Sequence, residues 1–256
     1  MFPISDDNPT LRTPVMTIAL LVVTWAVWLL VEGAGDPFAL AVSVCNFGLV
    51  PGELTQMARL GDGVPLGVID GRRLACIINN EPINWATPVL SMFLHGSWSH
   101  IIGNTLYLWV FGNNVEDSMG RARFLAFYLL TGVIAALAHI AVSPASPVPT
   151  VGASGAISGI MGAYLLLYPR VKVRTYFPPI FLFRVPAWAV LIFWFGAQLI
   201  SGLPQLRPFE RDVSGGVAVW AHIGGFIAGA LLAHLFRNPE FVRRRKVAGD
   251  AKVVWS

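Results

Sequence analysis

The chain has 256 residues, of which 55% are hydrophobic and 12% are charged, and its mean hydropathy is +0.64. A soluble domain carries roughly a quarter charged residues, so this composition excludes an ordinary soluble enzyme and a disordered chain. The net charge of +4 is too small to indicate a nucleic-acid partner. The composition therefore predicts a protein that crosses the lipid bilayer several times in one compact domain.

The first apolar segment covers about residues 13–31, close to the roughly 20 residues that a transmembrane helix needs. A cleaved secretory signal is the alternative, but Asp6, Asp7 and a single Arg12 make a poor basic leader. Residues 32–85 form a polar stretch with many Pro, Gly and acidic residues. Because this stretch is too long for a simple connection, we expect an outer loop with short helices on the membrane surface.

Five more apolar segments follow, and each is predicted to be a transmembrane helix. They cover about residues 99–115, 124–142, 154–168, 187–203 and 219–236. The predicted fold is an all-α bundle of six transmembrane helices in one domain, residues 1–236, followed by a basic tail, 237–256. The segment 154–168 is short and rich in glycine. Such a short helix is tolerated only where protein or a water-filled cavity surrounds its end.

The orientation follows from Lys and Arg, which favour the cytoplasmic side of a membrane. With the N-terminus inside, only five of the 18 Lys and Arg residues fall in outer segments: Arg59, Arg72, Arg73, Arg207 and Arg211. Both termini are therefore expected in the cytoplasm. The basic run 243–246 is predicted to anchor the tail at the membrane rather than to bind nucleic acid.

Four polar side chains lie inside the predicted spans, where polar groups are costly and usually functional. His100 and Asn104 are four residues apart, so they share one face of the second span. Ser154 opens the fourth span, and His222 lies one turn into the sixth. All three spans enter from the outer side, so the four side chains are expected at one depth, just below the outer surface.

Small residues on two of these spans allow the helix backbones to approach closely. Gly155 and Gly159 follow the serine of the fourth span, and Ala221, Gly225 and Gly229 surround the histidine of the sixth. Close approach of these faces would bring the hydroxyl and the imidazole within hydrogen-bond distance, as an activated serine nucleophile requires.

The chemistry that fits these residues is acyl transfer by a Ser–His dyad. No Asp or Glu in the spans lies near Ser154 and His222 in the sequence to complete a triad. His100 and Asn104 offer N–H donors for a developing oxyanion. The backbone N–H of Ser154 at a helix start offers another.

These residues resemble three motifs of the rhomboid intramembrane serine proteases. The motifs stand here as Gly152-Ala153-Ser154-Gly155, His100-x-x-x-Asn104 and Ala221-His222-x-x-Gly225-x-x-x-Gly229. The resemblance implies that Ser154 is the nucleophile and His222 the general base. It also implies an oxyanion and substrate-binding site at His100, Asn104, Ser154 and Gly152. The implied substrates are membrane-anchored proteins, which are cut in or near a transmembrane segment. The reaction is expected to need no metal or cofactor.

Two features depart from the family pattern. Many members carry a Trp-Arg pair before the second span, where this chain has Asn84-Trp85-Ala86-Thr87, so the bracing of the outer loop is expected to differ. Some members carry an aromatic residue one turn after the nucleophile, where this chain has Ser158. The imidazole of His222 is therefore expected to be oriented by other contacts, such as packing against neighbouring side chains.

Simpler roles stand beside the catalytic ones. Ser154 could be only a helix cap, His222 a core histidine, and His100 with Asn104 polar contacts between helices. His95 is expected to brace the loop. His139 and His234 lie late in their spans and are expected to be structural, on other faces or at other depths. The five histidines show no zinc-binding spacing.

The alternative function is a non-catalytic rhomboid-like protein that binds and escorts membrane clients. A small-solute transporter is a third class, but the two halves of the chain do not resemble each other as inverted repeats would. The expected location is a bacterial inner membrane. Cys45 and Cys76 both lie in the outer loop, and the sequence leaves open whether they form a disulfide. It also leaves open the oligomeric state and the natural substrate.

Overall fold

The six predicted apolar segments all fold as helices. The computed structural model describes residues 2–69, 71–179, 181–204 and 218–243. The helices are α1 (Val15–Leu30), α5 (Trp98–Tyr107) continued by η4 (Leu108–Gly112) and α6 (Asn113–Met119), α7 (Arg121–Val142), α8 (Ser154–Leu167), α9 (Ala187–Gly202) and α10 (Val219–Phe236). Prolines stand next to these helices, at Pro14, Pro169 and Pro186, where they do not interrupt helical hydrogen bonds.

Within the described residues, α7 and α10 are long and apolar enough to cross a membrane, while α1, α8 and α9 are shorter apolar helices. The middle of the α5–α6 helix is the π-helical segment η4. Local π-helix is unusual and often lies near a functional site. The sequence also predicts that the fifth apolar segment and the polar loop 204–216 admit a substrate helix from the side. Residues 205–217 of this region, and residues 244–256 of the basic tail, lie outside the described residues.

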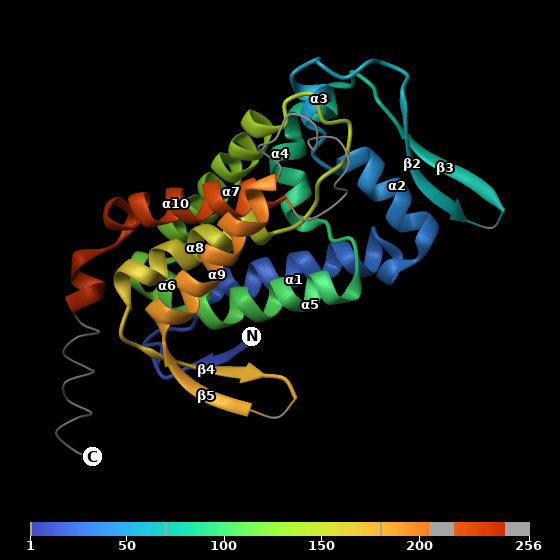
Figure 1. The fold of residues 1–256 in the computed structure, drawn as a ribbon. Helices are drawn as coiled ribbons and strands as arrows, with labels where there is room; N and C mark the ends of the chain where they lie inside the picture. The colour runs from blue at the N-terminus through green and yellow to red at the C-terminus, as the bar shows by residue number, and fades with distance from the viewer. Residues whose placement is uncertain (1, 70, 180, 205–217, 244–256) are drawn as a thin grey trace.

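The segment between α1 and α5 contains short helices, as predicted, and also a β-hairpin that was not predicted. The helices are η1 (Gly33–Gly35), α2 (Pro37–Phe47), α3 (Pro51–Leu54), η2 (Pro82–Ala86), α4 (Thr87–Leu90) and η3 (Ser91–Phe93). The hairpin pairs β2 (Gly63–Ile69) with β3 (Arg72–Ile77), and it projects from the helical body (Figure 1). Cys45 of α2 and Cys76 of β3 form a disulfide that ties the hairpin to α2.

The all-α prediction is wrong about the segment between α8 and α9 and about the N-terminus. An antiparallel sheet forms there in the order β1–β4–β5, from β1 (Phe2–Asp6), β4 (Lys172–Phe177) and β5 (Phe181–Pro186). In β4 the exposed Lys172 and Arg174 alternate with the buried Val173 and Thr175. This period of two residues is typical of a strand with one buried face.

Helix α8 lies at the centre of the helical body, between α7, α9 and α10 (Figure 1). Ten consecutive residues of α8, from Gly155 to Tyr164, are buried. A helix that is buried on every side has little room for large side chains where neighbouring backbones come close. This explains why α8 is rich in glycine.

The packing of α10 on α8 depends on glycines in both helices. A methyl group built on Gly225 would overlap the carbonyl oxygen of Gly155, and one built on Gly229 would overlap the backbone of Gly159. The two backbones are therefore in direct contact, as the small-residue faces predicted. This contact fixes where the starts of α8 and α10 lie relative to each other.

At the opposite end of the helices, Glu116 of α6 caps the start of α1. Its carboxylate accepts hydrogen bonds from the backbone N–H of Met16 at 3.0 Å and of Thr17 at 2.8 Å, and from the Thr17 hydroxyl at 2.8 Å. Pro14, which precedes α1, provides no side-chain cap. A side chain from another helix thus satisfies N–H groups that a helix start leaves without partners.

Replacement of Glu116 by alanine is expected to destabilise the protein by about 2 kcal/mol, because buried donors at the start of α1 lose their acceptor. Unfolding in detergent, followed by circular dichroism, measures this loss. Glu116→Gln keeps one acceptor oxygen and should lose less. Equal stability of wild-type protein and Glu116→Ala would show that the cap does not hold α1.

Candidate active site

Ser154 is the first residue of α8, and the chain reaches it through a glycine in an unusual conformation. Gly152 has φ +128°, a region that favours glycine, and its backbone N–H donates to the carbonyl oxygen of Ser91 at 2.8 Å. The first N–H groups of a helix have no partner within the helix. The start of α8 therefore provides a hydroxyl beside N–H groups that favour an anion.

His222 of α10 forms a hydrogen bond with Ser154. Its Nε2 lies 2.7 Å from Ser154 Oγ, and its Nδ1 lies 2.8 Å from Oε1 of Gln198 on α9. His222 is 7% exposed. The Ser158 hydroxyl, one turn after Ser154, donates to the Ser154 carbonyl oxygen at 2.6 Å. The structure thus brings together two side chains that are 68 residues apart in the sequence.

His100 of α5 lies beside the serine because Gly152 has no side chain. A methyl group built on Gly152 would lie 2.7 Å from His100 Nε2 and 3.6 Å from Ser154 Oγ, so the ring nitrogen and the hydroxyl border one small space. The backbone N–H of Gly96 donates to His100 Nδ1 at 3.4 Å. That contact leaves the proton on Nε2, the nitrogen that faces this space.

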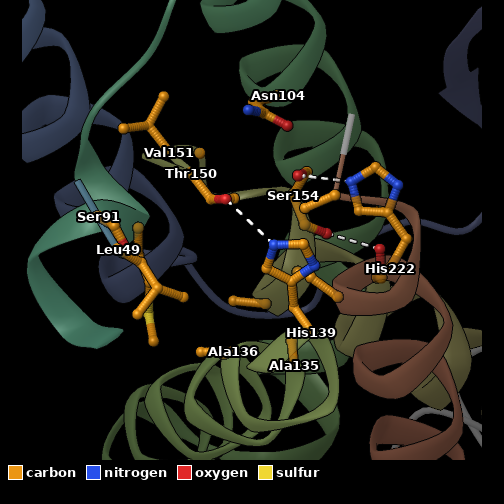
Figure 2. Close-up of a pocket in the computed structure, with 18 of the residues that line it drawn as sticks. Leu49, Ser91, Asn104, Ala135, Ala136, His139, Thr150, Val151, Ser154 and His222 are labelled. Carbon is orange, nitrogen blue, oxygen red and sulfur yellow. Dashed lines mark hydrogen bonds between the residues drawn. The ribbon is translucent and has the colours of Figure 1, made fainter. Parts of the chain in front are cut away.

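Asn104 lies one turn after His100 and lines the same cavity, which has a volume of about 700 Å³. Asn104 is 8% exposed, and its side-chain Nδ2 is buried without a hydrogen-bond partner among the described residues. Such an unpaired buried donor is unusual in a folded protein. Figure 2 shows Asn104, Ser154 and His222 around this cavity.

The comparison with protein families identifies the family to which the chain belongs. The model of the Rhomboid domain matches residues 82–239, which is more than half of the chain. The chain belongs to the rhomboid family. It is therefore an integral membrane protein built mainly of helices.

Several known proteins are similar to this rhomboid. The Rhomboid protease GluP of Bacillus subtilis is 34% identical over 156 residues, covering 61% of this chain and 27% of GluP. The Rhomboid protease AarA of Providencia stuartii is 33% identical over 164 residues, covering 58% and 54%. Rhomboid protein 1, mitochondrial, of Saccharomyces cerevisiae is 27% identical over 166 residues, covering 61% and 44%. The chain thus spans only a quarter to about half of the length of these relatives.

The rhomboid chain also has a buried histidine and a buried glutamate next to the site. The ring of His95 lies edge-on to that of His100, with 5.0 Å between the ring centroids, and the His95 backbone N–H donates to Glu32 Oε1 at 2.8 Å. Burial, with His100 close by, lowers the pKa of His95 to about 3, and burial raises the pKa of Glu32 to about 7. His95 is therefore neutral at physiological pH and supports the position of His100.

Sequence reasoning placed one histidine wrongly. His139, expected on another face or at another depth, lines the same cavity, and its Nε2 lies 3.2 Å from the Thr150 hydroxyl (Figure 2). His139 is near the end of α7 and lines the same cavity as Ser154. His139 lies three residues before the end of the predicted span 124–142. This position near the helix end was the signal in the sequence that could have placed His139 at the cavity. Gln198, near the end of α9, was missed although it is a polar residue in an apolar span.

The other sequence-predicted site residue, Gly152, lines the cavity, but its own N–H is bonded to Ser91. Gly152 therefore contributes space for His100 and not a donor. In the described part of the chain, no three His, Cys, Asp or Glu side chains are grouped as metal ligands would be. That the site works without a metal or cofactor stays a prediction.

Proposed function

We propose that this rhomboid is an intramembrane serine endopeptidase that cuts membrane-anchored proteins in or near a transmembrane segment. The observation that carries the proposal is the 2.7 Å contact between Ser154 Oγ and His222 Nε2. A nucleophile and a base at this distance are the signature of an activated serine. The similar proteins GluP and AarA are both named as rhomboid proteases, which supports the same function.

In the first step, Ser154 Oγ attacks the carbonyl carbon of the scissile peptide bond. The hydroxyl proton passes to His222 Nε2, which is the only group within 2.7 Å of Oγ among the described hydrogen-bond partners. The carbonyl oxygen becomes an oxyanion as the new carbon–oxygen bond forms. Donors that already point to this position stabilise the transition state without having to rearrange.

The donors for the oxyanion are His100 Nε2–H, the Asn104 amide and the backbone N–H of Ser154. His100 and Ser154 border the space beside Gly152, and the Asn104 amide nitrogen lacks another partner. Mutation of a single oxyanion donor costs about 10²–10³-fold in rate in other serine proteases. The simpler role of His100 and Asn104 as polar contacts between helices does not explain why the Asn104 donor is left unpaired.

The protonated His222 then gives its proton to the amine of the leaving peptide, which departs. Water attacks the acyl group on Ser154, and His222 takes the proton of that water as it did from the serine. The proton on Nε2 finally returns to Ser154 Oγ. The cavity of about 700 Å³ that opens beside Ser154 provides room for this water.

We propose six membrane crossings with both termini in the cytoplasm and the site below the outer surface of a bacterial inner membrane. Arg12, before α1, pairs with Asp117 of α6, and Asn238, after α10, bonds to Ser118 of α6 at 2.8 Å. The start of α1 and the end of α10 therefore share one end of the bundle. The Cys45–Cys76 disulfide in the proposed outer loop fits an oxidising exterior.

The test is cleavage in proteoliposomes that hold the full chain and single-pass reporter proteins with transmembrane segments rich in Gly and Ala. Wild-type protein is expected to produce fragments cut in or near the membrane segment. Ser154→Ala is expected to produce none, although the variant folds.

Two results would contradict the proposal. Fragments that form equally with wild-type protein and Ser154→Ala would assign the cleavage to another protease. Stable binding of uncut reporters, together with failure of the wild-type protein to react with a serine-directed fluorophosphonate, would favour a non-catalytic escort protein instead.

A further inference from the structure

Gln198 of α9 contacts the side of the His222 ring that faces away from the serine. Its Oε1 lies 2.8 Å from His222 Nδ1, while the other ring nitrogen lies 2.7 Å from Ser154 Oγ. The three side chains thus form a row with the imidazole in the middle. They come from three helices, α8, α9 and α10.

The chemistry of this row fixes the position of a proton. A neutral imidazole carries one proton, on either Nδ1 or Nε2, and only the nitrogen without the proton can accept another. An amide oxygen has lone pairs and no proton, so its hydrogen bond with Nδ1 requires that Nδ1 carries the proton. Nε2 then has its lone pair directed to the serine hydroxyl, as a general base needs.

We propose that Gln198 is a positioning residue that holds the His222 ring in its productive tautomer and orientation. The inference rests on the proposed function and adds a third member to the dyad. Gln198 also stabilises the imidazolium that forms after proton transfer, because the same Nδ1–H bond becomes stronger when the ring is charged. An amide performs this task without placing a carboxylate inside the membrane, where an ionised group is costly.

A second observation explains why this chain needs such a residue. Ser158, one turn after the nucleophile, directs its hydroxyl to the Ser154 carbonyl oxygen, so it does not cover the His222 ring. Trp194, one turn before Gln198 on α9, lies next to that ring, with 5.7 Å between the ring centroids. Besides the bond to Ser154, the two contacts of the His222 ring with Gln198 and Trp194 therefore both come from α9.

The test compares the rate of reaction with a fluorophosphonate for the full chain in detergent micelles. In this reaction Ser154 Oγ forms a bond to phosphorus, fluoride leaves, and the hydroxyl proton passes to His222 Nε2. Gln198→Met keeps the size of the side chain and removes the acceptor. We expect about a tenfold lower labelling rate, which corresponds to the loss of one hydrogen bond.

Gln198→Glu distinguishes a positioning role from a merely structural one, because only a positioning role changes the pH dependence of the labelling rate. The carboxylate still accepts from Nδ1, and it favours the protonated ring because an opposite charge lies close by. We expect labelling near the wild-type rate at alkaline pH and a half-maximal rate displaced by about one pH unit to higher pH. Ile200→Ala, a truncation on the outward face of α9 where the side chain is 71% exposed, is the matched control and should label like the wild type.

The outcomes separate this inference from the proposed function. Rates are expressed per folded protein, measured by gel filtration, so that loss of folding is not counted as loss of reactivity. Labelling of wild-type protein but not of Ser154→Ala supports the proposed function, and absence of labelling in the wild type contradicts it. If both Gln198 variants label with the wild-type rate and pH profile while Ser154→Ala does not label, Gln198 has no positioning role.

Discussion

Ser154→Ala, His222→Ala and the double variant are each expected to lose about a thousandfold or more of the cleavage rate, and to similar extents. A serine hydroxyl is a weak nucleophile without a base, and an imidazole without the serine has no nucleophile to activate. Residues that act as one unit have effects that do not multiply. The 2.7 Å contact between Oγ and Nε2 predicts such a unit.

The measurement is the initial rate of reporter cleavage in proteoliposomes at equal amounts of folded protein. His234→Ala is the matched control, because His234 is an exposed histidine near the end of the same helix, α10. It should cleave like the wild type. A double variant that is about a thousandfold slower than either single variant would show that Ser154 and His222 act independently, which contradicts the dyad.

Gly229→Ala is expected to separate α10 from α8 and to destabilise the protein by about 3 kcal/mol. The added methyl group would overlap the backbone of Gly159, and neither of two packed helix backbones can rotate away as a side chain would. The α8–α10 contact also positions the serine against the histidine. We therefore expect the cleavage rate per folded protein to fall as well.

Gly196→Ala is the matched control for this prediction. Gly196 lies within α9, and a methyl group built there has no neighbour within 4 Å, so the same change should leave stability equal or slightly higher. Unfolding by increasing fractions of a denaturing detergent measures both variants. Equal stability of Gly229→Ala and Gly196→Ala would show that the close contact between α8 and α10 does not hold the fold.

The helices could be predicted from the sequence because length and apolar composition suffice to define them. The predicted segment 219–236 coincides with α10 (Val219–Phe236), and the predicted segment 154–168 ends one residue beyond α8 (Ser154–Leu167). The neighbourhood of Ser154 and His222 was predicted because both lie in the first turn of their helices, and those helix starts were expected at the same depth. Small residues beside each of them then indicated that the two helices come into contact.

The strands and the supporting residues of the site could not be predicted in the same way. The strands β1 and β4 are 170 residues apart at their first residues, Phe2 and Lys172, and each is too short to stand out by composition. Their pairing is a long-range contact that hydropathy does not encode. Gln198 was missed and His139 was misplaced because helix rotation, as well as depth, decides whether a side chain faces the cavity, and an apolar span shows no strong periodicity.

The most direct test of the account is to react wild-type protein and His222→Ala with a fluorophosphonate and to locate the adduct by mass spectrometry of the peptides. We expect a single adduct on Ser154 in the wild type and at least a hundredfold slower adduct formation in His222→Ala, because the hydroxyl has lost its base. An adduct on another serine, or equal labelling of Ser154 in both proteins, would contradict the claim that these two side chains form the reactive pair.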